Sequence, residues 1–118
     1  RVVTSLLRER LNFNGVAITD DLEMGAIVRN FGIGEACKMA IAAGEDMLAI
    51  CASPEAIREG FGAVKAAVEA GEISETRIDE SLRRIASLKA RIGPAVSFDA
   101  DRFINVSNRV KELNDKLK

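Results

Sequence analysis

The chain of 118 residues contains no histidine, no tryptophan and no tyrosine. The absence of histidine limits the acid and base chemistry that these residues can complete. Only two cysteines occur, Cys37 and Cys51, in segments that read as helix and strand. Their spacing resembles neither a metal clip nor a disulfide framework. We therefore expect two reduced thiols in the core, no metal site and no cofactor.

Long apolar runs are also absent, because Lys, Glu or Asp interrupts every hydrophobic stretch within a few residues. No segment has the pattern of a transmembrane helix or a secretory signal. The formal net charge is -1, which provides no field to attract nucleic acid or a membrane surface. We expect neither partner, and a cytoplasmic location is the working expectation.

Hydrophobic periodicity divides the chain into helices and strands. In order, it predicts a helix over 2–11, a strand over 16–19, helices over 24–28 and 35–43, a strand over 46–51, helices over 54–71 and 74–91, and a short polar helix in the last two dozen residues. Ser53-Pro54 and Gly93-Pro94 supply the chemistry of a helix start and a helix end. The alternation predicts a helix-rich α/β fold with two parallel strands.

Two acids, Asp20 and Asp21, follow the first predicted strand. The strand shows no polar alternation, which is typical of a parallel strand covered on both faces. Side chains alternate along a strand, so Ile18 and Asp20 share one side while Thr19 and Asp21 share the other. At most one of the two acids then acts as a nucleophile. Considered alone, such a pair more often caps the helix that follows.

The segment around these acids resembles a known family signature. Residues 6–26 read LLRERLNFNGVAITDDLEMGA. This run is similar to the signature of the β-N-acetylglucosaminidases of glycoside hydrolase family 3, and it departs from that signature only at Asn12 and Asn14, where Gly and Asp are commoner. The resemblance continues through 42–48, 71–74 and 77–85, so that it covers roughly Leu6 to Leu88.

The resemblance implies that residues 1–95 form the C-terminal part of a TIM-type (β/α)8 barrel and that 96–118 form a tail with a short helix. A complete barrel needs roughly 250 residues, which is more than the 118 present. The chain also begins at Arg1 directly on a helical pattern. We expect a fragment holding about two strands and four to six helices.

The resemblance also implies a reaction. In the family, the acid after Ser or Thr attacks the anomeric carbon of a terminal β-linked N-acetylglucosamine and forms a covalent glycosyl-enzyme, which water opens with retention. By position this role falls on Asp20. Asp21 and Thr19 would support the loop, and Met24 would line the sugar pocket. The alternative for Met24 is a core position at its helix start.

Other parts of the family's machinery lie outside these residues. The resemblance assigns proton transfer to an Asp-His pair, and sugar binding to a Lys-His-Phe-Pro-Gly motif, both upstream. The expected partners are therefore a carbohydrate with N-acetylglucosaminyl groups and the missing N-terminal portion of the barrel. Without that portion we expect no activity, and we expect self-association through exposed strand edges and apolar faces.

Two other interpretations stay open at this point. Paired acids at a strand end also occur in phosphoacceptor receiver domains, but the second predicted strand ends without a carboxylate. The chain is alternatively a non-catalytic helical interaction module or an inert truncation product. Basic residues on the long helix, Arg83, Arg84, Lys89 and Arg91, are expected to form a solvated face because acids lie among them.

Overall fold

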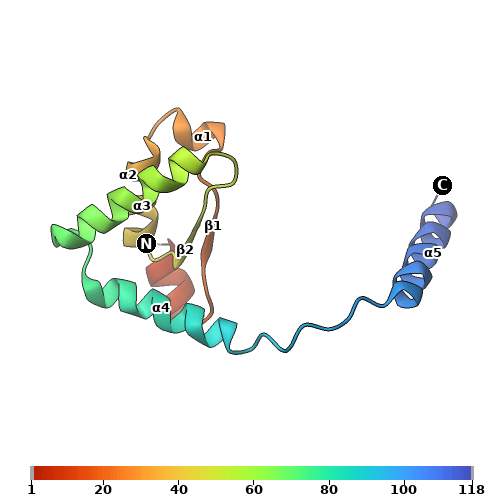
Figure 1. The fold of residues 1–118 in the computed structure, drawn as a ribbon. Coiled ribbons are helices and arrows are strands. Elements are labelled where there is room, and N and C mark those ends of the chain that lie inside the picture. The colour runs from red at the N-terminus through yellow and green to blue at the C-terminus, as the bar shows by residue number, and fades with distance from the viewer. Residues whose placement is uncertain (1, 118) are drawn as a thin grey trace.

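A computed structural model of the chain describes residues 2–117 (Figure 1). Its elements are η1 (Val2–Arg10), β1 (Ile18–Asp21), α1 (Gly25–Val28), α2 (Ile33–Ala43), β2 (Met47–Ala49), α3 (Pro54–Glu69), α4 (Glu75–Lys89) and α5 (Ala100–Lys116). The predicted order of helices and strands is confirmed, and so is the helix-rich α/β class. The second strand is shorter than predicted, and the final helix, at 17 residues, is not short.

The two strands pair in parallel, with Ile18 opposite Met47 and Asp21 opposite Ala49. The register is irregular between these pairs, and the Thr19 hydroxyl accepts the Ala49 N–H at 2.9 Å there. The first strand begins two residues later than predicted, so both acids belong to it. Pairing with β2 sets these bounds, whereas the sequence pattern reports only β propensity.

Local capping explains where the long helices begin and end. The Ser53 hydroxyl accepts the Ala56 N–H at 3.1 Å, and the Ser74 hydroxyl accepts the Arg77 N–H at 3.2 Å. The Ser53 cap confirms the predicted start of α3. Gly44 ends α2 with φ at +117°, a left-handed conformation that glycine adopts without steric cost.

The predicted N-terminal helix is present as η1, but it is wound as a π-helix. The Leu11 N–H donates to the Leu6 carbonyl, and the Phe13 N–H donates to the Leu7 carbonyl. These bonds reach back five and six residues, farther than in an α-helix. Leu6 and Leu11 stay exposed, so the predicted apolar face of this helix is only partly covered.

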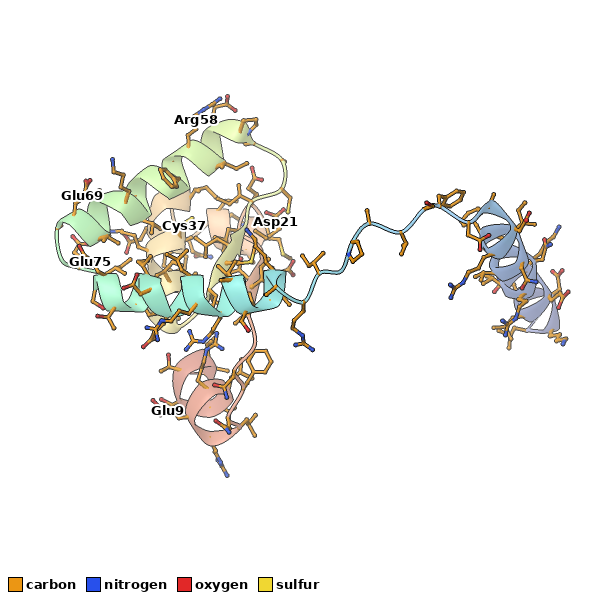
Figure 2. All side chains as sticks on the ribbon, turned by 60° about the horizontal axis from the view of Figure 1, so that its bottom comes forward. Glu9, Asp21, Cys37, Arg58, Glu69 and Glu75 are labelled. Atoms are coloured by element: carbon orange, nitrogen blue, oxygen red, sulfur yellow. The ribbon has the colours of Figure 1, made fainter. Side chains whose placement is uncertain are left out.

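The core lies where α2, α3 and the loop before α4 meet. Its members are the buried Ile41, Ala67 and Ile73, with Leu48, Val64, Val68 and Ile78 packed against them. Cys37 is fully buried, and Figure 2 shows it among the interior side chains, whereas those of Arg58 and Glu69 extend outward. The prediction of two core thiols is wrong for Cys51, which is free but exposed beyond the end of β2.

One face of the strand pair is open. In Figure 1, α2 and α3 lie on one side of the strands, and α4 runs below their amino ends. On the other side, Ile18 is 57% exposed and Asp20 is also exposed. Thr19 and Asp21, which alternate with them along the strand, are half-buried. The prediction of a strand covered on both faces is therefore wrong for this chain, because its helices cover only one face.

The last helix lies apart from the other elements, at the end of an extended segment over 92–99 (Figure 1). This arrangement raises the radius of gyration to 19.4 Å, compared with roughly 13.5 Å for a compact chain of this length. Phe98 and Phe103 contact each other at the helix start, with ring centroids 5.7 Å apart.

Within residues 2–117, no helix combines the length and apolarity needed to cross a lipid bilayer.

A buried carboxylate, that of Asp46, joins the amino ends of the two strands to the surrounding helices. Its side chain is 0% exposed. Arg8 of η1 and the Ala17 N–H donate to one oxygen, the latter at 3.0 Å. Ser81 and Arg84 of α4 donate to the other oxygen, at 2.7 and 3.1 Å. The expectation that Arg84 is merely solvated is wrong, because it faces this carboxylate.

A third arginine completes this arrangement. Arg77 lies 3.6 Å from the Asp46 carboxylate, and it also donates to the carbonyls of Ile41 and Glu45 and to the Ser81 hydroxyl. Burial alone raises the pKa of Asp46. The Ala17 N–H, Ser81, Arg8 and Arg84 outweigh that effect and hold the pKa below its ordinary value.

Replacing Asp46 with Asn should therefore lower the free energy of unfolding by about 3 kcal/mol, because the arginines lose their buried counter-charge. Urea titration at neutral pH measures this loss. The folded pKa is the lower one, so the stabilisation is present above the unfolded pKa of about 3.9 and is lost as pH falls through the folded value. The wild type should lose stability more steeply than Asp46→Asn below about pH 4. Asp79→Asn, on the exposed side of α4, is the matched control and should change little.

Two glycines of α3 provide a test of the packing between α2 and α3. A Cβ at Gly60 would lie 2.7 Å from the Cys37 sulfur and 3.1 Å from the Ile50 side chain, whereas a Cβ at Gly62 would meet nothing within 4 Å. Gly60→Ala should destabilise by about 1–3 kcal/mol through overpacking. Gly62→Ala should stabilise by about 0.5–1 kcal/mol through helix propensity. Thermal unfolding of both variants compares them, and equal shifts would contradict this account.

Candidate active site

The predicted site residues lie at the carboxyl end of β1. Asp20 is exposed, and its carboxylate accepts the Asp21 N–H at 2.8 Å. Asp21 is half-buried, and its carboxylate accepts the Glu23 N–H at 3.0 Å. The alternation of sides within the strand is therefore confirmed. The carboxyl ends of parallel strands are where α/β folds present reactive side chains.

A pocket of about 320 Å³ opens beside these acids. It is lined by Thr19, Asp20, Asp21, Leu22, Met24, Ala26, Ile27 and Glu45. All three predicted site residues, Asp20, Asp21 and Met24, contribute to it. Both acids share this wall although they alternate along β1, because the strand ends at Asp21 and the backbone turns at Leu22.

The side chain of Met24 is 48% exposed and precedes α1. The structure thus places Met24 at the pocket and not in the core, which was the alternative reading for this residue. Together with Ala26 and Ile27 it gives the pocket an apolar wall opposite the carboxylates. An apolar wall with a few polar groups is the common composition of small-molecule sites.

A further acid, Glu23, links this turn to the loop after β2. Its carboxylate accepts the Ala52 N–H at 2.6 Å and the Ser53 N–H at 3.1 Å. The sequence pattern alone gives no role to Glu23. Its position inside the DDLEM motif gives no sign of a contact with residues 30 positions away, so only the fold reveals this contact.

Cys51 joins the same acidic mouth from the end of β2. Desolvation raises the pKa of this thiol, and the negative charges of Asp21 (labelled beside the strands in Figure 2), Glu23 and Asp20 raise it further.

Within residues 2–117, no group of three or more His, Cys, Asp or Glu side chains is placed to hold a metal ion. Among the same residues, one carboxylate oxygen of Glu45 is buried without a hydrogen-bond partner. The described groups at the pocket are thus carboxylates, a hydroxyl and apolar side chains. Such a site offers a carboxylate nucleophile, while retaining glycoside hydrolysis also needs a second, proton-transferring group, ordinarily about 5 Å away.

The thiol of Cys51 should report on this acidic cluster. Because its pKa is raised, iodoacetamide should alkylate Cys51 severalfold more slowly at pH 8 than it alkylates a free cysteine peptide. Asp21→Asn removes the nearest charge and should speed the reaction, whereas Asp79→Asn should not. Mass spectrometry of the digested chain separates Cys51 from the buried Cys37. Alkylation of wild-type Cys51 at the rate of the free peptide would contradict the proposed electrostatics.

Comparison with known proteins places this chain in a family. Residues 1–88 match the family described as "Glycosyl hydrolase family 3 N terminal domain". The chain belongs to this family. The resemblance drawn from the motif around Asp20 is therefore confirmed at the level of the family, and the receiver-domain interpretation is wrong.

Three relatives show how much of a family member the chain represents. It is 35% identical over 92 residues to the beta-N-acetylglucosaminidase/beta-glucosidase of Cellulomonas fimi, with 78% of this chain and 16% of that protein covered. It is 31% identical over 113 residues to the beta-hexosaminidase of Methylococcus capsulatus, with 94% and 31% covered. The structure of a family 3 beta-N-acetylglucosaminidase from Paenibacillus sp. str. FPU-7 superposes with a TM-score of 0.73 at 41% identity, covering 80% of this chain and 19% of that one. The chain thus spans less than a third of each of these proteins.

Proposed function

We propose that this chain supplies the nucleophile side of a retaining exo-β-N-acetylglucosaminidase, with Asp20 as the nucleophile. One observation carries the proposal: an exposed carboxylate stands at the carboxyl end of a parallel strand, on the wall of a pocket. Membership in glycosyl hydrolase family 3 and the names of the relatives support the substrate class.

In the proposed reaction a carboxylate oxygen of Asp20 attacks the anomeric carbon of a terminal N-acetylglucosamine. The glycosidic bond breaks, and the departing oxygen takes a proton from an acid outside these residues. Water then attacks the anomeric carbon of the glycosyl-aspartate and gives a proton to the conjugate base of that acid. The bond between the sugar and Asp20 breaks, and the sugar leaves with retained configuration. The Asp21 N–H, 2.8 Å from a carboxylate oxygen of Asp20, orients the group for attack.

Other pocket residues have supporting roles in this proposal. Asp21 holds the turn by accepting the Glu23 N–H, and Met24 provides an apolar surface for the sugar. Thr19 fixes the end of β1 to β2 through the Ala49 N–H. These roles agree with the position of each residue around one pocket.

The open face of the strand pair supports a further part of the proposal, that the chain acts as the C-terminal part of a TIM-type barrel. Ile18 and Met47 both expose apolar surface there. Neighbouring strands and the lumen of a barrel would cover this surface. Without them we propose that the 118-residue chain associates with itself through this face and does not hydrolyse glycosides.

The experiment uses the 118-residue chain and the full-length protein that carries it. With a chromogenic β-N-acetylglucosaminide, the full-length protein should turn over and the chain alone should not. An activated fluorosugar that traps the glycosyl-enzyme should add one sugar mass to the full-length protein, on the peptide that contains Asp20. Asp20→Asn should abolish both labelling and turnover, a loss of about 10⁴-fold or more, because the nucleophile is gone.

Asp79→Asn is the matched control and should be labelled as the wild type is. Labelling on another carboxylate, or full activity of Asp20→Asn, would remove Asp20 from the proposed role. Turnover by the isolated chain would show that the second proton-transferring group lies within these residues.

A further inference from the structure

The contacts of Glu23 bridge the turn after β1 and the turn after β2. Its carboxylate oxygens accept the Ala52 N–H at 2.6 Å and the Ser53 N–H at 3.1 and 3.3 Å. The side chain of Glu23 is half-buried between them. Both oxygens are therefore engaged by backbone amides of a segment about 30 residues away in the sequence.

The chemistry at this point favours a carboxylate. Ala52 and Ser53 immediately precede α3, where N–H groups lack partners within the helix and the helix dipole is positive. The Ser53 hydroxyl accepts the Ala56 N–H. The backbone N–H of Ser53 needs an acceptor from another residue, and Glu23 provides it. An ionised acceptor forms stronger hydrogen bonds to such groups than a neutral acceptor does.

The same turn leads directly to Asp20. The Asp21 N–H donates to the Asp20 carboxylate, and the Glu23 N–H donates to the Asp21 carboxylate. The Leu22 N–H donates to the Ala49 carbonyl at 2.9 Å. The backbone that orients Asp20 is thus held on one side by β2 and at its far end by the Glu23 carboxylate.

We propose that Glu23 is a positioning residue, which fixes the turn after β1 to the turn after β2 and thereby holds Asp20 in place for attack. This inference rests on the proposed function of Asp20. Glu23 touches neither the substrate nor the reacting atoms. It acts by limiting the displacement of Asp20, and a displacement of about 1 Å at a reacting group can lower the rate about 10²-fold.

The first measurement needs no activity. Amide hydrogen exchange of the 118-residue chain, followed by NMR, reports on the Ala52 and Ser53 N–H groups. In Glu23→Ala their exchange should accelerate at least about tenfold relative to the wild type, because their acceptor is gone. The Arg77 N–H donates to the Ser74 hydroxyl and serves as the internal reference. Unchanged exchange at both positions would overturn the proposed bridge.

The second measurement uses the full-length protein, with kcat expressed per site labelled by the fluorosugar. Glu23→Ala should lower kcat per labelled site about 10²-fold and change KM by less than about threefold. Glu23→Gln keeps one oxygen acceptor and should restore part of the loss. Glu69→Gln, at the far end of α3 and 66% exposed, is the matched control and should behave as the wild type.

The outcomes separate this inference from the proposed function. A merely structural role for Glu23 would reduce the labelled fraction and leave kcat per labelled site unchanged, and that result overturns the inference while Asp20 stands. If wild-type protein is not labelled at all, the role of Asp20 fails, and the positioning role of Glu23 fails with it. A lower kcat per labelled site, together with faster exchange at Ala52 and Ser53, supports the inference.

Discussion

The arrangement of this chain depends on one buried charge, the carboxylate of Asp46. It lies immediately before β2 and receives hydrogen bonds from η1, from the backbone before β1 and from α4. A buried carboxylate without these partners would cost several kcal/mol. The segment that carries Asp46, η1, the backbone before β1 and α4 must therefore be in place together. The hydrogen bonds between Ala17 and Asp46 join the amino ends of β1 and β2, the parallel pair on which the candidate site is built.

The two ends of the strand pair have different roles. At the amino end the acid is fully buried among arginines and contributes to stability. At the carboxyl end Asp20 and Asp21 line a pocket, and no described cation pairs with either of them. This division agrees with the general separation of stability and chemistry between the two ends of barrel strands. The few residues between Asp46 and Cys51 therefore connect a structural cluster to a candidate active site.

The open face of the strand pair leaves apolar side chains in contact with water. The helices bury one face of the pair, but Ile18 and Met47 keep apolar surface exposed on the other. Removing such surface from water is worth about 25 cal/mol per Å². The chain spans less than a third of the relatives with which it was compared.

The sequence by itself determined the order of elements, the cap at Ser53, the family, and the placement of Asp20 at a strand end. Each of these depends on local hydrogen bonds, on periodicity or on a contiguous motif. Only the tertiary structure decided the bounds of β1, the burial of Asp46 and the bridge made by Glu23. Those features depend on contacts between residues about 30 or more positions apart, and neither propensity nor spacing records such contacts.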